Sequence, residues 1–269
     1  MKASMRALGA HLRAHLAVMM HYRGEVLLWS IWGIVNPAVL YAMWSAAAGG
    51  SASHEIAGYD RGGLAAYFLI MMIVGHLTGA WDVYQMGFFV RTGALSPMLL
   101  QPALPMWRSV AENLAYKVVT LMFTIPVWII FAWVVTPHFQ PTAWSILLGV
   151  IALTLGAILA FVLCYVVSLF AFWAPKIDAL GEVYFGLCMF LGGRFAPVEA
   201  LPKPIESLAR IMPFKWMYEF PTELFIGGRL TPTDACIGLL IQCGWIAVSI
   251  AAFRITWAAG LKRYTAVSG

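Results

Sequence analysis

Few side chains in this sequence have the types and spacing that chemistry requires. His11 and His15 stand four residues apart and would share one helix face, but no carboxylate or cysteine accompanies them as a further metal ligand. The sequence contains no GxxxxGK[ST] to bind nucleotide phosphates, no HExxH for zinc hydrolysis and no GxSxG for acyl transfer. It therefore predicts a chain without a catalytic site, a metal site or a cofactor of its own.

Three ionisable residues interrupt apolar stretches, namely His76, Asp82 and Glu182. Ionisable side chains inside a membrane are costly and are therefore candidates for function. For the two carboxylates a place near the cytoplasmic interface is the simpler interpretation, since the cost there falls from ~3 to about 0–1 kcal/mol. An intramembrane enzyme would also need a nucleophile beside a base, and Ser145 and Ser168 have no suitable spacing to His76.

The composition indicates a chain dissolved in lipid. Of its 269 residues, 62% are hydrophobic and 11% charged, with a mean hydropathy of +0.81, whereas soluble domains carry about 25% charged residues. A spanning helix needs about 20 apolar residues, so the chain can cross a bilayer about six times and has no room for an ATPase domain. The net charge of +5 suits membrane topology rather than nucleic acid, and the four cysteines show no CxxC spacing.

We therefore expect an all-α integral membrane protein with six transmembrane helices, forming one transmembrane domain over residues 1–269. Uncharged or sparsely charged runs of sufficient length predict the spans. Pro37 lies inside the first span, and Gly75 and Gly79 form a GxxxG pair in the second, a pattern that permits close helix approach. The predicted spans are residues 25–48, 64–86, 114–135, 143–170, 177–195 and 235–257.

Three further segments lie between or before the spans. Residues 1–23 are amphipathic and predict a retained helix along the cytoplasmic interface. Residues 87–113 are too long for a turn and predict a helical inside segment. Residues 196–234 are rich in proline and predict short, broken re-entrant helices on the outside. In this topology eleven of the 17 Lys and Arg residues lie on the side of the termini, which predicts cytoplasmic N- and C-termini.

Two local motifs accompany this arrangement. The first is Gly93-Ala-Leu-Ser-Pro-Met-Leu-Leu-Gln-Pro102, and the second is Phe190-Leu-Gly-Gly-Arg-Phe-Ala-Pro197, which is followed by Met212-Pro-Phe214. Together with the order of the spans, they resemble ABC-2 type permeases over the whole chain. The resemblance is to the branch of short permeases commonly encoded in pairs beside one ATPase, with the first motif as coupling segment and the second as the exit of span five.

The resemblance implies an ATP-driven exporter of the bacterial inner membrane that moves a hydrophobic or amphiphilic substrate. Its partners would be membrane lipid, a second copy or a sister permease, and a cytoplasmic ABC ATPase subunit that holds ATP and magnesium; no nucleic acid is expected. Five residues would contact the ATPase: Arg91, Leu95, Leu99, Leu100 and Arg108. Six are expected to line the translocation path: Trp29, Trp32, Met71, Met72, Tyr184 and Met189.

The main alternative is a secondary carrier or channel that works without ATP. Such a protein is expected to contain inverted repeats and charged groups at the middle of the membrane. The sequence displays neither clearly, so the exporter interpretation is favoured.

Overall fold

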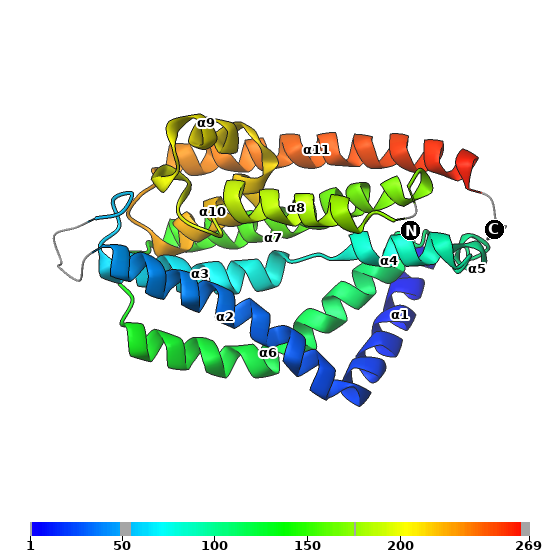
Figure 1. The fold of residues 1–269 in the computed structure, drawn as a ribbon, viewed down its shortest axis with the longest axis horizontal. Coiled ribbons are helices and arrows are strands. Elements are labelled where there is room, and N and C mark those ends of the chain that lie inside the picture. The colour runs from blue at the N-terminus through cyan, green and yellow to red at the C-terminus, as the bar shows by residue number, and fades with distance from the viewer. Residues whose placement is uncertain (1, 49–54, 175, 265–269) are drawn as a thin grey trace.

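The computed structural model describes residues 2–48, 55–174 and 176–264, apart from the side chains of residues 2–7, 23, 29, 30 and 32, and its regular elements there are helical (Figure 1). The elements are α1 Lys2–His21, α2 Arg23–Ala47, α3 Arg61–Thr78, α4 Asp82–Arg91, α5 Leu95–Leu99, α6 Met106–Val135, α7 Ala143–Ser168, η1 Leu169–Phe172, α8 Asp178–Leu191, η2 Val198–Ala200, α9 Lys203–Ile211, α10 Pro213–Ile226 and α11 Pro232–Arg263.

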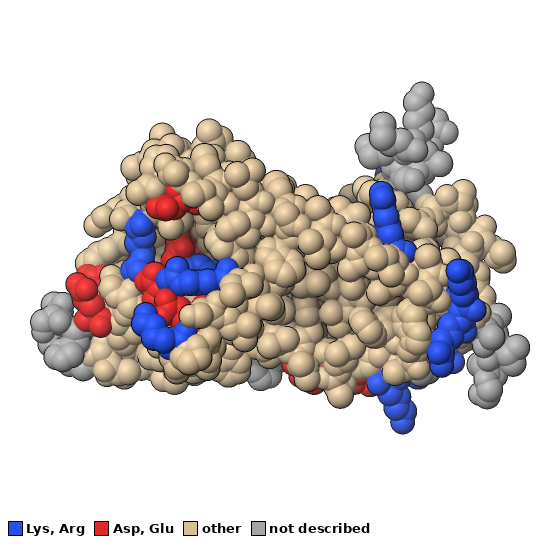
Figure 2. All heavy atoms as spheres, turned by 90° about the horizontal axis from the view of Figure 1, so that it is seen from above, with Lys and Arg blue, Asp and Glu red and all other residues tan. Residues whose placement is uncertain are grey.

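Within the described residues, five segments are long and apolar enough to cross a membrane: Gly24–Ala47, Arg61–Arg91, Met106–Val135, Ala143–Phe172 and Pro232–Arg263. The start of α1, the end of α11 and α5 lie at one end of the molecule, and α9 lies at the other (Figure 1). Figure 2 shows charged side chains gathered toward the two ends of one face, with a broad uncharged belt between them. The expected all-α membrane fold is confirmed.

The fifth predicted span corresponds to α8, which packs beside α7 but has only 14 residues. At 1.5 Å per residue it is about 21 Å long, less than the ~30 Å of a hydrocarbon core. The chain then turns at Gly192 and continues through η2, α9 and α10, the broken helices that the prolines predict. The number of six crossings stays a prediction, because α8 covers its span only in part.

The second predicted span is not one continuous helix. It breaks at residues 79–81 into α3 and α4, where the Gly79 amide donates to the Gly75 carbonyl at 3.0 Å and the backbone then turns away. On α6, the Asn113 amide nitrogen donates to the Gly79 carbonyl at 3.0 Å. A break inside a membrane is tolerated when neighbouring helices satisfy the released backbone groups, and Asn113 does so here.

The re-entrant helix α10 forms part of the core, packed against α3, α7 and α11. Gly156 of α7 permits this contact, because a Cβ atom there would lie 2.8 Å from the Met217 carbonyl oxygen. The Gln242 amide nitrogen of α11 donates to the Ala152 carbonyl at 2.9 Å and to the Trp216 carbonyl at 2.7 Å. These bonds fix α10 between two spanning helices.

A methyl group at Gly156 should separate α7 from α10. We expect Gly156→Ala to destabilise the protein by about 1–3 kcal/mol, the usual cost of overpacking, because the atom it meets belongs to the backbone and cannot rotate away. Thermal unfolding in mild detergent measures this loss. Gly186→Ala on α8 is the matched control, since a Cβ there meets nothing within 4 Å; equal melting temperatures for the two variants would contradict the packing argument.

Candidate translocation cavity

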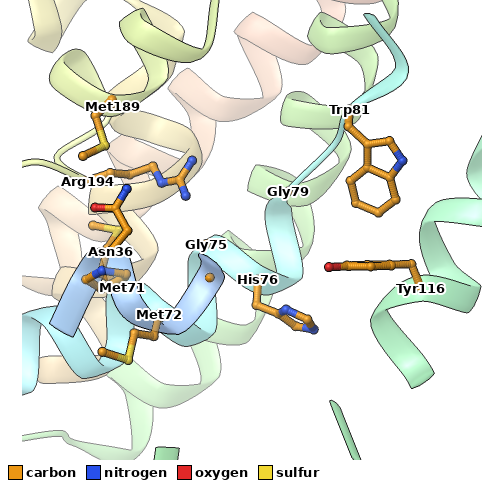
Figure 3. Close-up of a pocket in the computed structure, with 12 residues that line it drawn as sticks. Asn36, Met71, Met72, Gly75, His76, Gly79, Trp81, Tyr116, Met189 and Arg194 are labelled. Carbon is orange, nitrogen blue, oxygen red and sulfur yellow. The ribbon is translucent and has the colours of Figure 1, made fainter. Parts of the chain in front are cut away.

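A cavity of about 140 Å³ lies between α2, α3, α6 and the end of α8. It sits near the middle of the spans, because Asn36 lies halfway along α2 and Gly75 lies close to the midpoint of the Arg61–Arg91 span. Figure 3 shows how ten of its residues surround it. The lining consists of Gly33, Asn36, Pro37, Met71, Met72, Gly75, His76, Gly79, Trp81, Tyr116, Met189 and Arg194.

Three of the six predicted path residues line this cavity, namely Met71, Met72 and Met189. Tyr184 does not, because it is buried in the core and its hydroxyl donates to the Ala160 carbonyl at 3.4 Å. Trp29 and Trp32 belong to α2, but their side chains lie outside the described residues. Thioether side chains are flexible and polarisable, so the three methionines give the cavity an adaptable apolar wall.

The cation of the cavity is Arg194, one of the six Lys and Arg residues that the predicted topology places on the side opposite the termini. Gly193 adopts φ +77° and its carbonyl accepts a hydrogen bond from the Tyr67 hydroxyl at 2.6 Å. A Cβ at Gly193 would lie 2.6 Å from that hydroxyl oxygen, so only glycine fits this turn. The turn directs Arg194 inward, where its guanidinium lies 5.2 Å from the Tyr218 ring centroid and packs over Gly75 (Figure 3).

Both glycines of the predicted GxxxG pair line the cavity. Gly75 faces the Arg194 side chain, and a Cβ there would lie 3.8 Å from a guanidinium nitrogen, an ordinary van der Waals contact. Gly79 ends α3. The close helix approach that the pair predicts is not seen at Gly75 in the described part of the chain, where a Cβ would meet the Arg194 side chain.

Of the three ionisable residues that interrupt apolar stretches in the sequence, His76 lines the cavity. Its Nε2 atom lies 3.0 Å from the Thr120 hydroxyl of α6, which fixes the ring orientation. Asp82 instead lies buried in the first turn of α4, and Glu182 is exposed on α8, where it accepts a hydrogen bond from the Tyr84 hydroxyl at 2.8 Å. Neither carboxylate contributes to the cavity lining.

The two serines considered as nucleophiles form hydrogen bonds with backbone groups at the ends of α7. Ser145 forms a capping box with Thr142 at the start of α7. The Ser168 hydroxyl donates to the Tyr165 carbonyl at 2.6 Å near the end of the same helix. Since both hydroxyls satisfy helix-end backbone groups, their positions are explained without catalysis.

The predicted coupling segment folds as the end of α4, the short helix α5 and the first turns of α6, which begins at Met106 rather than near residue 114. Leu100, just after α5, is 89% exposed, and Arg91 is exposed as well. Leu99 is partly buried against the core, and Arg108 lies 5.8 Å from the Phe89 ring centroid.

Leu95 departs from the expectation for this segment. It is fully buried in the core and therefore holds α5 against the bundle instead of presenting a surface to a partner. A second contact that holds α5 in place is the 2.8 Å hydrogen bond between the Ser96 and Tyr264 hydroxyls, which joins α5 to the end of α11. The segment is thus a fixed protrusion whose tip is Leu100.

A family model described as ABC-2 family transporter protein matches residues 34–268, which include α5, α10 and the whole cavity lining except Gly33. The chain belongs to the ABC-2 transporter family. This ABC-2 protein is accordingly the membrane-spanning permease component of an ABC transporter. No curated protein matches it.

Proposed function

We propose that this permease is the membrane subunit of an ATP-driven exporter and that a separate cytoplasmic ABC ATPase hydrolyses ATP for it. Family membership is the observation that carries the proposal. The sequence has no phosphate-binding loop, so nucleotide and magnesium would be held by the partner chain. The exposed tip at Leu100, on a helix fixed to the bundle, suits a contact that transmits movement from the ATPase to the spans.

The proposed orientation places both termini and α5 in the cytoplasm of a bacterium and α9 outside its inner membrane. It rests on the excess of Lys and Arg on the side of the termini and on the position of α5 at that same end (Figure 1). If Arg194 lies within the membrane, it no longer counts among the Lys and Arg residues on the outside, and the excess on the side of the termini increases. Membrane lipid would surround the apolar belt, and a second permease, either identical or a sister chain, would complete the translocation path.

The proposed substrate is hydrophobic or amphiphilic. The cavity joins a methionine wall to a small number of polar groups, a combination typical of sites that bind small amphiphilic molecules. Closure of the ATPase would move the permease halves relative to each other and expose the cavity to the outside. Such rigid-body movement follows from the different affinities of the two conformations for nucleotide-bound ATPase.

One observation favours the alternative of a carrier without ATP, namely the charge of Arg194 at mid-membrane depth. A carrier driven by protons or cations would use a carboxylate at that depth, and neither Asp82 nor Glu182 lines the cavity. The exporter proposal is therefore retained.

The decisive experiment purifies the tagged chain from its native membrane in mild detergent and identifies its stoichiometric partners. We expect an ABC ATPase subunit and ATP hydrolysis in the purified complex, with or without a second permease. Recovery of the chain without any ATPase, together with transport in vesicles driven by an ion gradient alone, would overturn the proposal.

A further inference from the structure

The charge of Arg194 is not balanced inside the cavity. Other cations toward the outer end have carboxylate partners: Lys215 lies 3.6 Å from Glu219, Arg210 lies 2.9 Å from Glu206, and Arg229 pairs with Glu199. For Arg194, the described part of the chain provides a ring contact with Tyr218 but no carboxylate within 4 Å.

An unpaired guanidinium at this depth is energetically costly, and such a residue is therefore a candidate for function. Its five N–H donors form a planar fork that matches a carboxylate or phosphate group. The surrounding low dielectric would strengthen such a bond over its value in water. Asn36 brings an amide to the same side of the cavity, next to the guanidinium (Figure 3), and no Asp or Glu is part of the lining.

We propose that the cavity binds the acidic headgroup of an amphiphilic substrate, a carboxylate or a phosphate, through Arg194. The inference rests on the proposed function and narrows its substrate class from amphiphiles in general to anionic ones. Cationic amphiphiles are disfavoured, since the cavity offers them a like charge and no carboxylate.

The size of the cavity agrees with a headgroup and not with a whole lipid-like molecule. Its volume of about 140 Å³ is close to the ~150 Å³ of an apolar protein cavity that admits benzene. A long apolar tail would therefore extend outside the cavity.

The test compares two fluorescent probes with the same tail on the purified permease in lipid nanodiscs. The probes are 11-(dansylamino)undecanoate and the corresponding neutral undecanamide, with the signal of empty nanodiscs subtracted. We expect the wild type to bind the acid about tenfold or more tighter than the amide, as a hydrogen-bonded charge contact predicts. Arg194→Gln should bind both probes equally, and Arg194→Lys should keep part of the preference.

Two further variants keep the result interpretable. Arg210→Gln removes a cation outside the cavity and should keep the full preference for the acid. Gly75→Leu places a side chain against the guanidinium and should weaken acid binding while Arg194 remains. Equal binding of acid and amide by the wild type would overturn the inference, as would an undiminished preference in folded Arg194→Gln.

The outcome is separable from that of the proposed function. If the permease prefers the acid probe but binds no ATPase, the anion site at Arg194 is supported and the proposal of an ATP-driven exporter is refuted. An ATPase-driven transporter without acid preference would refute only the anionic headgroup.

Discussion

Replacing Leu100 by Asp should abolish transport and release the ATPase while the permease still inserts and folds. The side chain is 89% exposed and follows a helix anchored by the buried Leu95, so the substitution alters the contact surface and not the core. A carboxylate buried without a partner in an apolar contact is costly, and we expect a loss of about 2 kcal/mol or more, roughly a 30-fold change in affinity. Co-purification of the ATPase with the tagged variant measures the loss.

Leu208→Asp is the matched control for this experiment. Leu208 is likewise exposed but lies on α9, at the opposite end of the molecule (Figure 1). We expect it to retain the ATPase. Equal recovery of the ATPase with wild type and Leu100→Asp would show that the tip of the coupling segment is not the docking contact.

Lys215→Met should strongly destabilise the protein. The Lys215 ammonium lies 3.6 Å from a Glu219 oxygen and 3.9 Å from a Glu223 oxygen, and all three side chains are buried. Removing the lysine leaves two buried carboxylates without their cation, and breaking a buried ion pair in this way costs about 3–5 kcal/mol. For a chain of this size we expect the melting temperature to fall by roughly 10 °C.

Two comparisons identify the cause of that loss. Lys203→Met removes a cation that is 88% exposed on α9, and it should leave the melting temperature nearly unchanged. Lys215→Met combined with Glu219→Gln removes one of the two uncompensated charges and should recover part of the stability. An unchanged melting temperature in Lys215→Met alone would show that the carboxylates do not need this partner.

The buried cluster belongs to a larger group of charges around α9 and α10. Figure 2 shows Lys and Arg side chains surrounding acidic ones at this end of the molecule. On the exposed α9, hydrogen bonds from Lys203 and Arg210 lower the pKa of Glu206 below its usual value. The end of the permease that carries α9 is thus held by paired charges, in contrast to Arg194 within the cavity, which has no carboxylate partner in the described part of the chain.

In the predicted coupling segment, the residue pattern predicts the helix but not which of its side chains are exposed. The sequence predicted a helical segment on the inside; α5 confirms the helix, and the inside location stays a prediction. Leu95, Leu99 and Leu100 looked equivalent as apolar residues of that segment, but their exposures differ from none to 89%. Helical spacing defines which residues share a face, but it does not say which face the rest of the chain covers.

The sequence by itself determined the membrane environment and the broken segment before the last helix. Long uncharged runs must leave water, and prolines cannot continue a helix, so both conclusions follow from local chemistry. Only the tertiary structure decided which residues form the cavity. Met71, Met189 and Arg194 meet there because Gly193 turns the chain back. That turn brings together segments more than 100 residues apart, which no local pattern encodes.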